Sequence, residues 1–96
     1  MEAIVVTGEL DPVAALDLRE RLARATAVLR PVVEVDLAEV SAIHVAAVSA
    51  LIQAARRAKR QGGELRIEPP RSARARRELA LPAWFPTRII EGPRHR

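Results

Sequence analysis

The sequence contains no cysteine, very few aromatic residues and no long hydrophobic run, and each absence excludes a class of function. Without cysteine there is no disulfide, no thiolate nucleophile and no cysteine-ligated metal. The two histidines, His44 and His95, are too few for an ordinary zinc site, so we expect no bound metal. With only Trp84 and Phe85 as aromatics, the stacking surfaces that bind single-stranded nucleic acid are missing. No apolar stretch approaches the roughly 18 residues of a membrane span, and no signal peptide is visible, so we expect a cytoplasmic protein without membrane insertion.

The residues that are present are typical of one small globular domain. The 96 residues are 49% hydrophobic and 29% charged, which suffices for a single core of Ala, Val, Leu and Ile. The charge is uneven: residues 1–55 carry four basic and eight acidic side chains, and residues 56–96 carry twelve basic and four acidic ones. A basic half can attract nucleic acid, an acidic protein or anionic lipid. Lys59 is the only lysine among the sixteen basic residues, so the asymmetry also fits a general bias toward arginine.

The order of apolar runs and helix signals predicts an α/β domain in which strands and helices alternate. We expect strands at 3–7, 32–37, 65–68 and 87–91, and helices at 12–30, 45–61 and 72–79. Alternation of this kind requires right-handed crossovers, and so a mostly parallel sheet of about four strands with the helices packed on one face. The pattern fills residues 1–96 as a single domain, with 92–96 as a tail.

Helix boundaries and faces follow from particular residues. Asp11 and Pro12 form a helix start, with an acid at the N-cap and proline at the first helical position. The Gly62-Gly63 pair predicts the end of the second helix. The expected apolar stripe of the first helix consists of Leu18, Leu22, Ala25 and Leu29. The expected outer face of the second helix carries Arg56, Arg57, Lys59 and Arg60.

The segment Gly8-Glu9-Leu10-Asp11 after the first strand, the Val35-Asp36-Leu37 strand and the Gly62-Gly63 helix end occur in an order that resembles the STAS domain of bacterial anti-anti-sigma factors. The resemblance runs from about residue 3 to residue 90. It implies a non-catalytic module that docks onto an anti-sigma factor of the histidine-kinase-like ATPase type. The implied docking residues are Glu9, Asp11, His44, Val45, Ala46, Ala47 and Val48.

The sequence departs from that family in three places. The family's first strand and its C-terminal helix are both missing, so we expect an exposed sheet edge that invites pairing between copies. Where switched members carry Asp-Ser-Ser-Gly, this chain has residues 44–47, His-Val-Ala-Ala. Ala46 stands at the phosphorylated serine and cannot accept a phosphoryl group. Ser49 is the nearest hydroxyl on the helix, and serine inside a helix is more often structural.

No catalytic constellation is visible, so we expect neither an enzyme nor a cofactor. No serine or threonine is accompanied by a histidine base and an acid, and no glycine-rich phosphate loop is present. Two alternatives to the anti-sigma reading stay open. A STAS domain can serve as a stable adaptor of a lipid-transport ABC complex, or the basic half can bind nucleic acid, although no reader motif supports the latter. His44 could also form a pH-sensitive contact.

Overall fold

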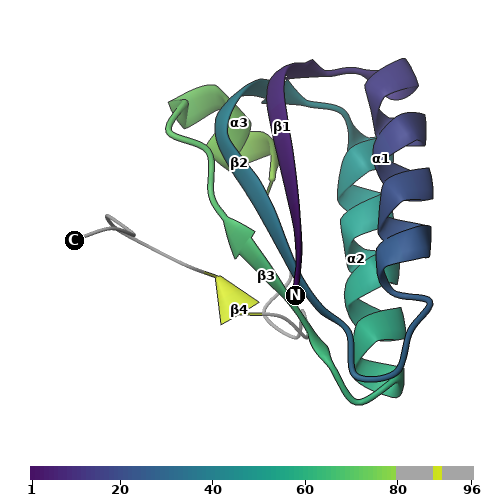
Figure 1. Ribbon diagram of the computed structural model, residues 1–96. Coiled ribbons are helices and arrows are strands. Elements are labelled where there is room, and N and C mark those ends of the chain that lie inside the picture. Colours follow the sequence, from purple (N-terminus) through teal and green to yellow (C-terminus); the bar gives the residue numbers. More distant parts are fainter. Residues whose placement is uncertain (80–87, 90–96) are drawn as a thin grey trace.

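Strands and helices alternate along the chain in the order that the sequence predicts (Figure 1). The computed structural model describes residues 1–79 and 88–89. Its elements are β1 (Glu2–Leu10), α1 (Pro12–Ala25), β2 (Val32–Ile43), α2 (Val45–Arg60), β3 (Glu64–Glu68), α3 (Ala73–Glu78) and β4 (Arg88–Ile89). The expected strand at 87–91 is described only at β4, and the expected tail at 92–96 lies outside the described residues.

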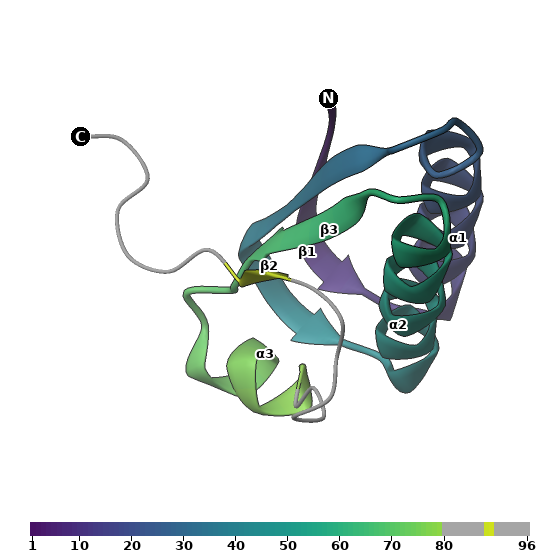
Figure 2. The same ribbon diagram turned by 90° about the horizontal axis from the view of Figure 1, so that it is seen from below.

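All neighbouring strands are parallel, in the order β1-β2-β3-β4, with three longer strands and a two-residue β4. Helices α1 and α2 lie side by side on one face of the sheet (Figures 1 and 2). Leu22 of α1 and Leu51 of α2 are fully buried in the same core as Val33 and Val35 of β2. The prediction of a parallel sheet with these two helices on one face is therefore confirmed. Among the described residues, β1 pairs only with β2 and forms one edge of the sheet.

Helix α1 is shorter than predicted. It ends at Ala25 rather than near Arg30, because the hydroxyl of Thr26 donates a hydrogen bond to the Leu22 carbonyl at 2.8 Å and closes the last turn. The same Thr26 oxygen accepts a 2.8 Å hydrogen bond from Arg57 Nε. Two expectations are wrong as a result. Leu29 lies beyond the helix and outside the core, and Arg57 is half-buried against α1 rather than on the outer face of α2.

The predicted glycine stop of α2 is confirmed, and its geometry is a Schellman cap. Gly62 adopts a φ of 82°, and its N–H donates to the Lys59 carbonyl at 3.0 Å. The Gly63 N–H donates to the Ala58 carbonyl at 2.8 Å. These two bonds satisfy carbonyls that the helix end would otherwise leave without a partner. The chain then turns directly into β3.

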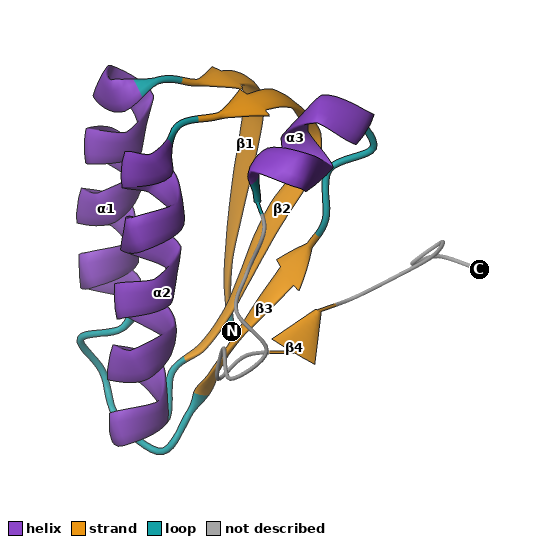
Figure 3. Ribbon diagram, turned by 180° about the vertical axis from the view of Figure 1, so that it is seen from behind, coloured by secondary structure: helices purple, strands orange, loops and turns teal. Residues whose placement is uncertain are grey.

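Strand β2 extends beyond the predicted 32–37 and outreaches its neighbour β3. Their pairing stops at Asp36 and Glu68, so no strand of the described residues pairs with the second half of β2 on that side. Helix α3 packs there instead, apart from α1 and α2 (Figure 3). The Arg71 N–H donates to the Ala38 carbonyl at 3.1 Å and continues the edge of the sheet where β3 leaves it. This arrangement carries α3 to the ends of β1 and β2.

Candidate functional site

The starts of α1 and α2 lie together because β1 and β2 end in register. Leu10 pairs with Ile43, and the His44 N–H donates to the Leu10 carbonyl at 2.9 Å. Asp11 directly follows β1 and caps α1, and His44 directly follows β2 and caps α2. Asp11 and His44, which are distant in sequence, are therefore brought to the same end of the sheet, where parallel folds place their binding sites.

Both caps use a side-chain acceptor. Asp11 Oδ1 accepts the Ala14 N–H at 2.8 Å, as the Asp-Pro sequence predicts. His44 Nδ1 accepts the Ala46 N–H at 3.0 Å. An accepting ring nitrogen carries no proton, so the cap is made by a neutral imidazole with its hydrogen on Nε2. His44 thus supplies the N-cap acceptor of α2, and a structural role for this histidine is clear.

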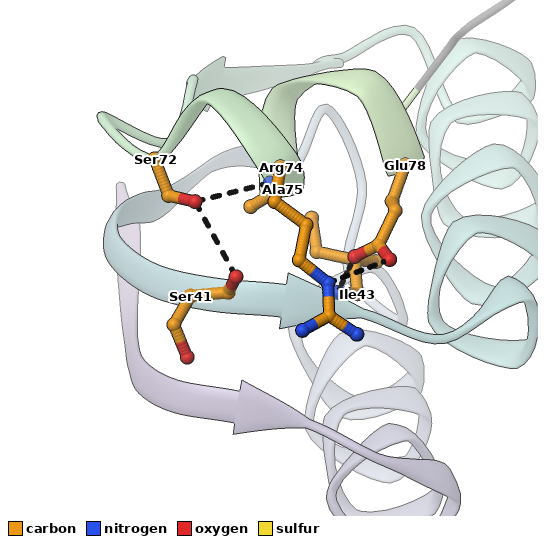
Figure 4. Close-up of polar contacts among 6 residues, drawn as sticks. All are labelled: Ser41, Ile43, Ser72, Arg74, Ala75 and Glu78. Carbon is orange, nitrogen blue, oxygen red and sulfur yellow. Dashed lines mark hydrogen bonds and ion pairs between the residues drawn. The ribbon is translucent and has the colours of Figure 1, made fainter.

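Helix α3 closes one side of this region with polar contacts to the free edge of β2 (Figure 4). The Glu78 carboxylate accepts the Ile43 N–H at 2.7 Å through Oε1 and the Arg74 guanidinium at 3.1 Å through Oε2. At the other end of α3, the Ser72 hydroxyl caps the helix by accepting the Ala75 N–H at 3.2 Å. Ser72 also donates to the Ser41 carbonyl at 3.4 Å. These side chains stand in for a strand along the end of β2.

Two shallow hollows flank the first turn of α2. The first is a crevice of about 320 Å³ between the ends of β1 and β2 and helix α3, and the second is a groove of about 370 Å³ between α1 and α2. Four predicted docking residues line the crevice: Glu9, Asp11, His44 and Val45. Ala46 and Ser49 line the groove, beside Leu16 and Arg19 of α1. The structure therefore brings most of the predicted docking residues onto one continuous surface.

Two predicted docking residues do not belong to that surface. Ala47 is fully buried where α2 packs on the core, and Val48 is half-buried against it. Sequence position could not separate them from Ala46, because the orientation of a helix face depends on where the helix meets the sheet. Their role in this structure is to hold α2 in place.

Sequence reasoning missed Arg74 and Glu78, which line the crevice from α3. The only local signal was their spacing of four residues, which is common to surface ion pairs on any helix. The bond from Ile43 to Glu78 spans 35 residues of sequence. No motif indicates a contact of this range.

The surface combines exposed aliphatic side chains with an acidic border. Val45 is 69% exposed at the start of α2, and Leu16 faces the groove. Glu9 and Asp11 are exposed at the border of the crevice. Small apolar contacts bordered by charge are suited to binding another protein. Within residues 1–79 and 88–89, no three His, Asp or Glu side chains gather as a metal site.

The hydrogen bonds to Glu78 predict a pH dependence of stability. The Ile43 N–H, followed by the Arg74 guanidinium, holds the pKa of the Glu78 carboxyl below its ordinary value. Because the pKa of this carboxyl is lower in the folded than in the unfolded protein, the ionised carboxylate stabilises the fold at pH values above its unfolded pKa of about 4.3. This contribution is lost as the pH falls below that value and passes through the folded pKa. Urea unfolding from pH 7 to pH 3 should show a flatter decline for Glu78→Gln than for the wild type. Parallel profiles would contradict the role assigned to this carboxylate.

A family model described as Mlab, STAS domain, matches residues 2–81, which is most of the chain. No curated protein matches the sequence. The matched residues include β1, the starts of both long helices and all of α3. No helix in the described part of the chain is long and apolar enough to cross a lipid bilayer.

Proposed function

Because the chain belongs to the STAS domain family, we propose that it is a non-catalytic protein–protein interaction module that acts as an anti-sigma factor antagonist in the bacterial cytoplasm. The proposed partner is an anti-sigma factor of the histidine-kinase-like ATPase type. The proposed docking end of the domain consists of Glu9, Asp11, His44, Val45 and Ala46.

The observation that carries this proposal is the exposed first turn of α2. Val45 and Ala46 are exposed, and the turn stands between the crevice and the groove. A partner can therefore contact the turn from both sides and bury its apolar atoms. The carboxylates of Glu9 and Asp11 lie at the border of the same surface and favour a partner with basic side chains opposite them.

The docking end lacks the family's phosphorylation switch. A phosphate adds about −1.5 to −2 charges and would change the first turn of α2 from apolar to anionic. Ala46 has no hydroxyl to accept it. Ser49 is exposed one turn further along and lines the groove, but it lies within the helix rather than at its start. We propose that the surface stays competent for docking whatever the kinase activity of the partner.

A reconstitution tests the function and the absence of the switch together. Purified chain is added to a complex of the cognate anti-sigma factor with its sigma factor, and free sigma factor is measured with and without prior incubation with ATP. We expect equal release in both conditions, and intact mass spectrometry should find no added phosphate. Loss of release after ATP, with a phosphate that Ser49→Ala removes, would contradict the missing switch. No release in either condition would contradict the proposed function.

A second candidate function is that of a stable adaptor subunit in a lipid-transport ABC complex. The missing hydroxyl at Ala46 favours it, since a permanent subunit needs no phosphorylation switch. Co-purification of the tagged full chain from its own cells distinguishes the two. A transporter ATPase in stoichiometric amount supports the adaptor, and a small histidine-kinase-like ATPase supports the antagonist.

A further inference from the structure

The end of the domain opposite the docking end carries an exposed aliphatic loop. The chain between α1 and β2 turns there beside the end of α2, at the bottom of Figure 1. Leu29 is 83% exposed and Val28 is 58% exposed in this loop. Together with Met1 and Val32, they line a hollow of about 360 Å³. Adjacent aliphatic side chains of this size at a loop tip are unusual unless something covers them.

The loop is held in this position by backbone contacts. The Arg30 N–H donates to the Gln61 carbonyl at 2.8 Å, and Arg30 itself adopts a φ of 52°. Pro31 is buried, and its carbonyl accepts the Glu64 N–H at 2.8 Å. The tip therefore projects from a fixed base formed by the end of α2 and the start of β3.

Basic side chains surround this tip. Arg24 and Arg30 line the same hollow as Val28 and Leu29. Lys59 and Arg60 are exposed in the last turn of α2, directly before the Gln61 carbonyl that holds the loop. Carboxylates of the described residues also lie nearby. Glu2 lines the hollow, and Glu64 forms a 2.6 Å ion pair with Arg66.

We propose that this basic aliphatic end, defined by Arg24, Val28, Leu29, Lys59 and Arg60, docks peripherally on an anionic lipid bilayer. Val28 and Leu29 enter the boundary between headgroups and acyl chains, while the basic side chains contact lipid phosphates. Charge complementarity selects this occupant. A second copy would bring two basic ends together, and their charges would repel. A bilayer provides an apolar layer behind a continuous anionic surface.

This inference does not depend on the proposed function. The docking end and the basic aliphatic end lie at opposite ends of the sheet (Figure 1), so the two can be occupied together. Vesicle binding is measured without any protein partner. Failure of one proposal therefore leaves the other in place.

The test is co-sedimentation of the full chain with two kinds of vesicle, phosphatidylcholine alone and phosphatidylcholine with about one third phosphatidylglycerol. We expect binding to the anionic vesicles only, and it should weaken as salt rises. Leu29→Ser should lower the partition coefficient about tenfold, because it removes aliphatic surface from the membrane. Val5→Ser is the matched control, since Val5 is 58% exposed on β1 away from the loop, and it should bind like the wild type.

The charge contribution has its own pair of variants. Arg24→Gln/Lys59→Gln should lower binding to anionic vesicles by about tenfold or more. Arg71→Gln/Arg77→Gln removes two exposed charges at the opposite end and should leave binding to anionic vesicles unchanged. Circular dichroism checks that every variant is folded. The proposal would be overturned by equal binding to neutral and anionic vesicles, by no binding to either kind, or by a Leu29→Ser variant that binds as well as the wild type. Displacement by soluble polyglutamate with no effect of Leu29→Ser would instead indicate an acidic protein ligand.

Discussion

Gly63→Ala is expected to lower the free energy of unfolding by about 3 kcal/mol or more. A Cβ atom on Gly63 would fall on the carbonyl oxygen of Pro31 and lie within 2.6 Å of the Pro31 nitrogen. Both are backbone atoms, so no side-chain rotation relieves the clash. The same Pro31 carbonyl accepts the Glu64 N–H at 2.8 Å, where β3 begins beside β2. Moving the Pro31 carbonyl away from Gly63 would disturb the start of the pairing between β2 and β3.

The neighbouring glycine is the matched control. Gly62 has a φ of 82°, but a Cβ built on it would meet only Arg30 Cγ at 3.6 Å, which is an ordinary contact. Gly62→Ala should therefore cost about 1 kcal/mol, from the left-handed conformation alone. Urea titrations of both variants give the comparison. An equal cost for the two, or a larger cost for Gly62→Ala, would contradict the close approach of Gly63 to Pro31.

The two glycines show how far sequence reasoning reaches. Their position after an apolar helix predicts the end of α2, and the Schellman cap confirms it. The sequence does not reveal that they serve different purposes. Gly62 is required by its backbone conformation, whereas Gly63 is required by contact with a residue more than thirty positions earlier. Only the folded chain brings Pro31 against Gly63.

The same limit explains the errors at the ends of elements. Leu18, Leu22 and Leu29 share one helical face, so periodicity extends α1 too far. The helix stops because Thr26 is fully buried and its hydroxyl is held by Leu22 and Arg57, and the second of these contacts is tertiary. Strand β2 is longer than its apolar run because it pairs with β1 as far as Ile43, whose N–H donates to Glu78 of α3. The local sequence around Thr26 and Ile43 does not indicate that Arg57 and Glu78 are their partners.

The candidate site was predictable in part for a topological reason. Parallel strands end at the same edge of a sheet, so Asp11 and His44 had to lie near each other once the alternation of elements was recognised. The capping role of Asp11 follows from residue type and position, whereas the cap made by His44 was not predicted; the structure gives both an acceptor bond. The burial of Ala47 and the contribution of Arg74 depend on how helices meet the sheet, and they could not be predicted.

Ala46→Asp is expected to weaken partner binding by roughly 1 to 3 kcal/mol. It places a carboxylate on the exposed first turn of α2, beside Glu9 and Asp11, where a docked partner would have to desolvate it. Folding should change little, because an acid near a helix N-terminus is locally favourable. The matched control is Arg60→Ala, at the far end of the same helix. Arg57 is unsuitable as a control, since its Nε donates to the buried Thr26 hydroxyl.

Titration calorimetry of the wild type, Ala46→Asp and Arg60→Ala against the purified partner tests the location of the docking end most directly. The prediction is a dissociation constant raised about five- to 150-fold by Ala46→Asp and left unchanged by Arg60→Ala, with all three proteins unfolding at similar urea concentrations. Wild-type affinity for Ala46→Asp together with lost binding for Arg60→Ala would place the partner on the basic end of α2 and contradict the assignment.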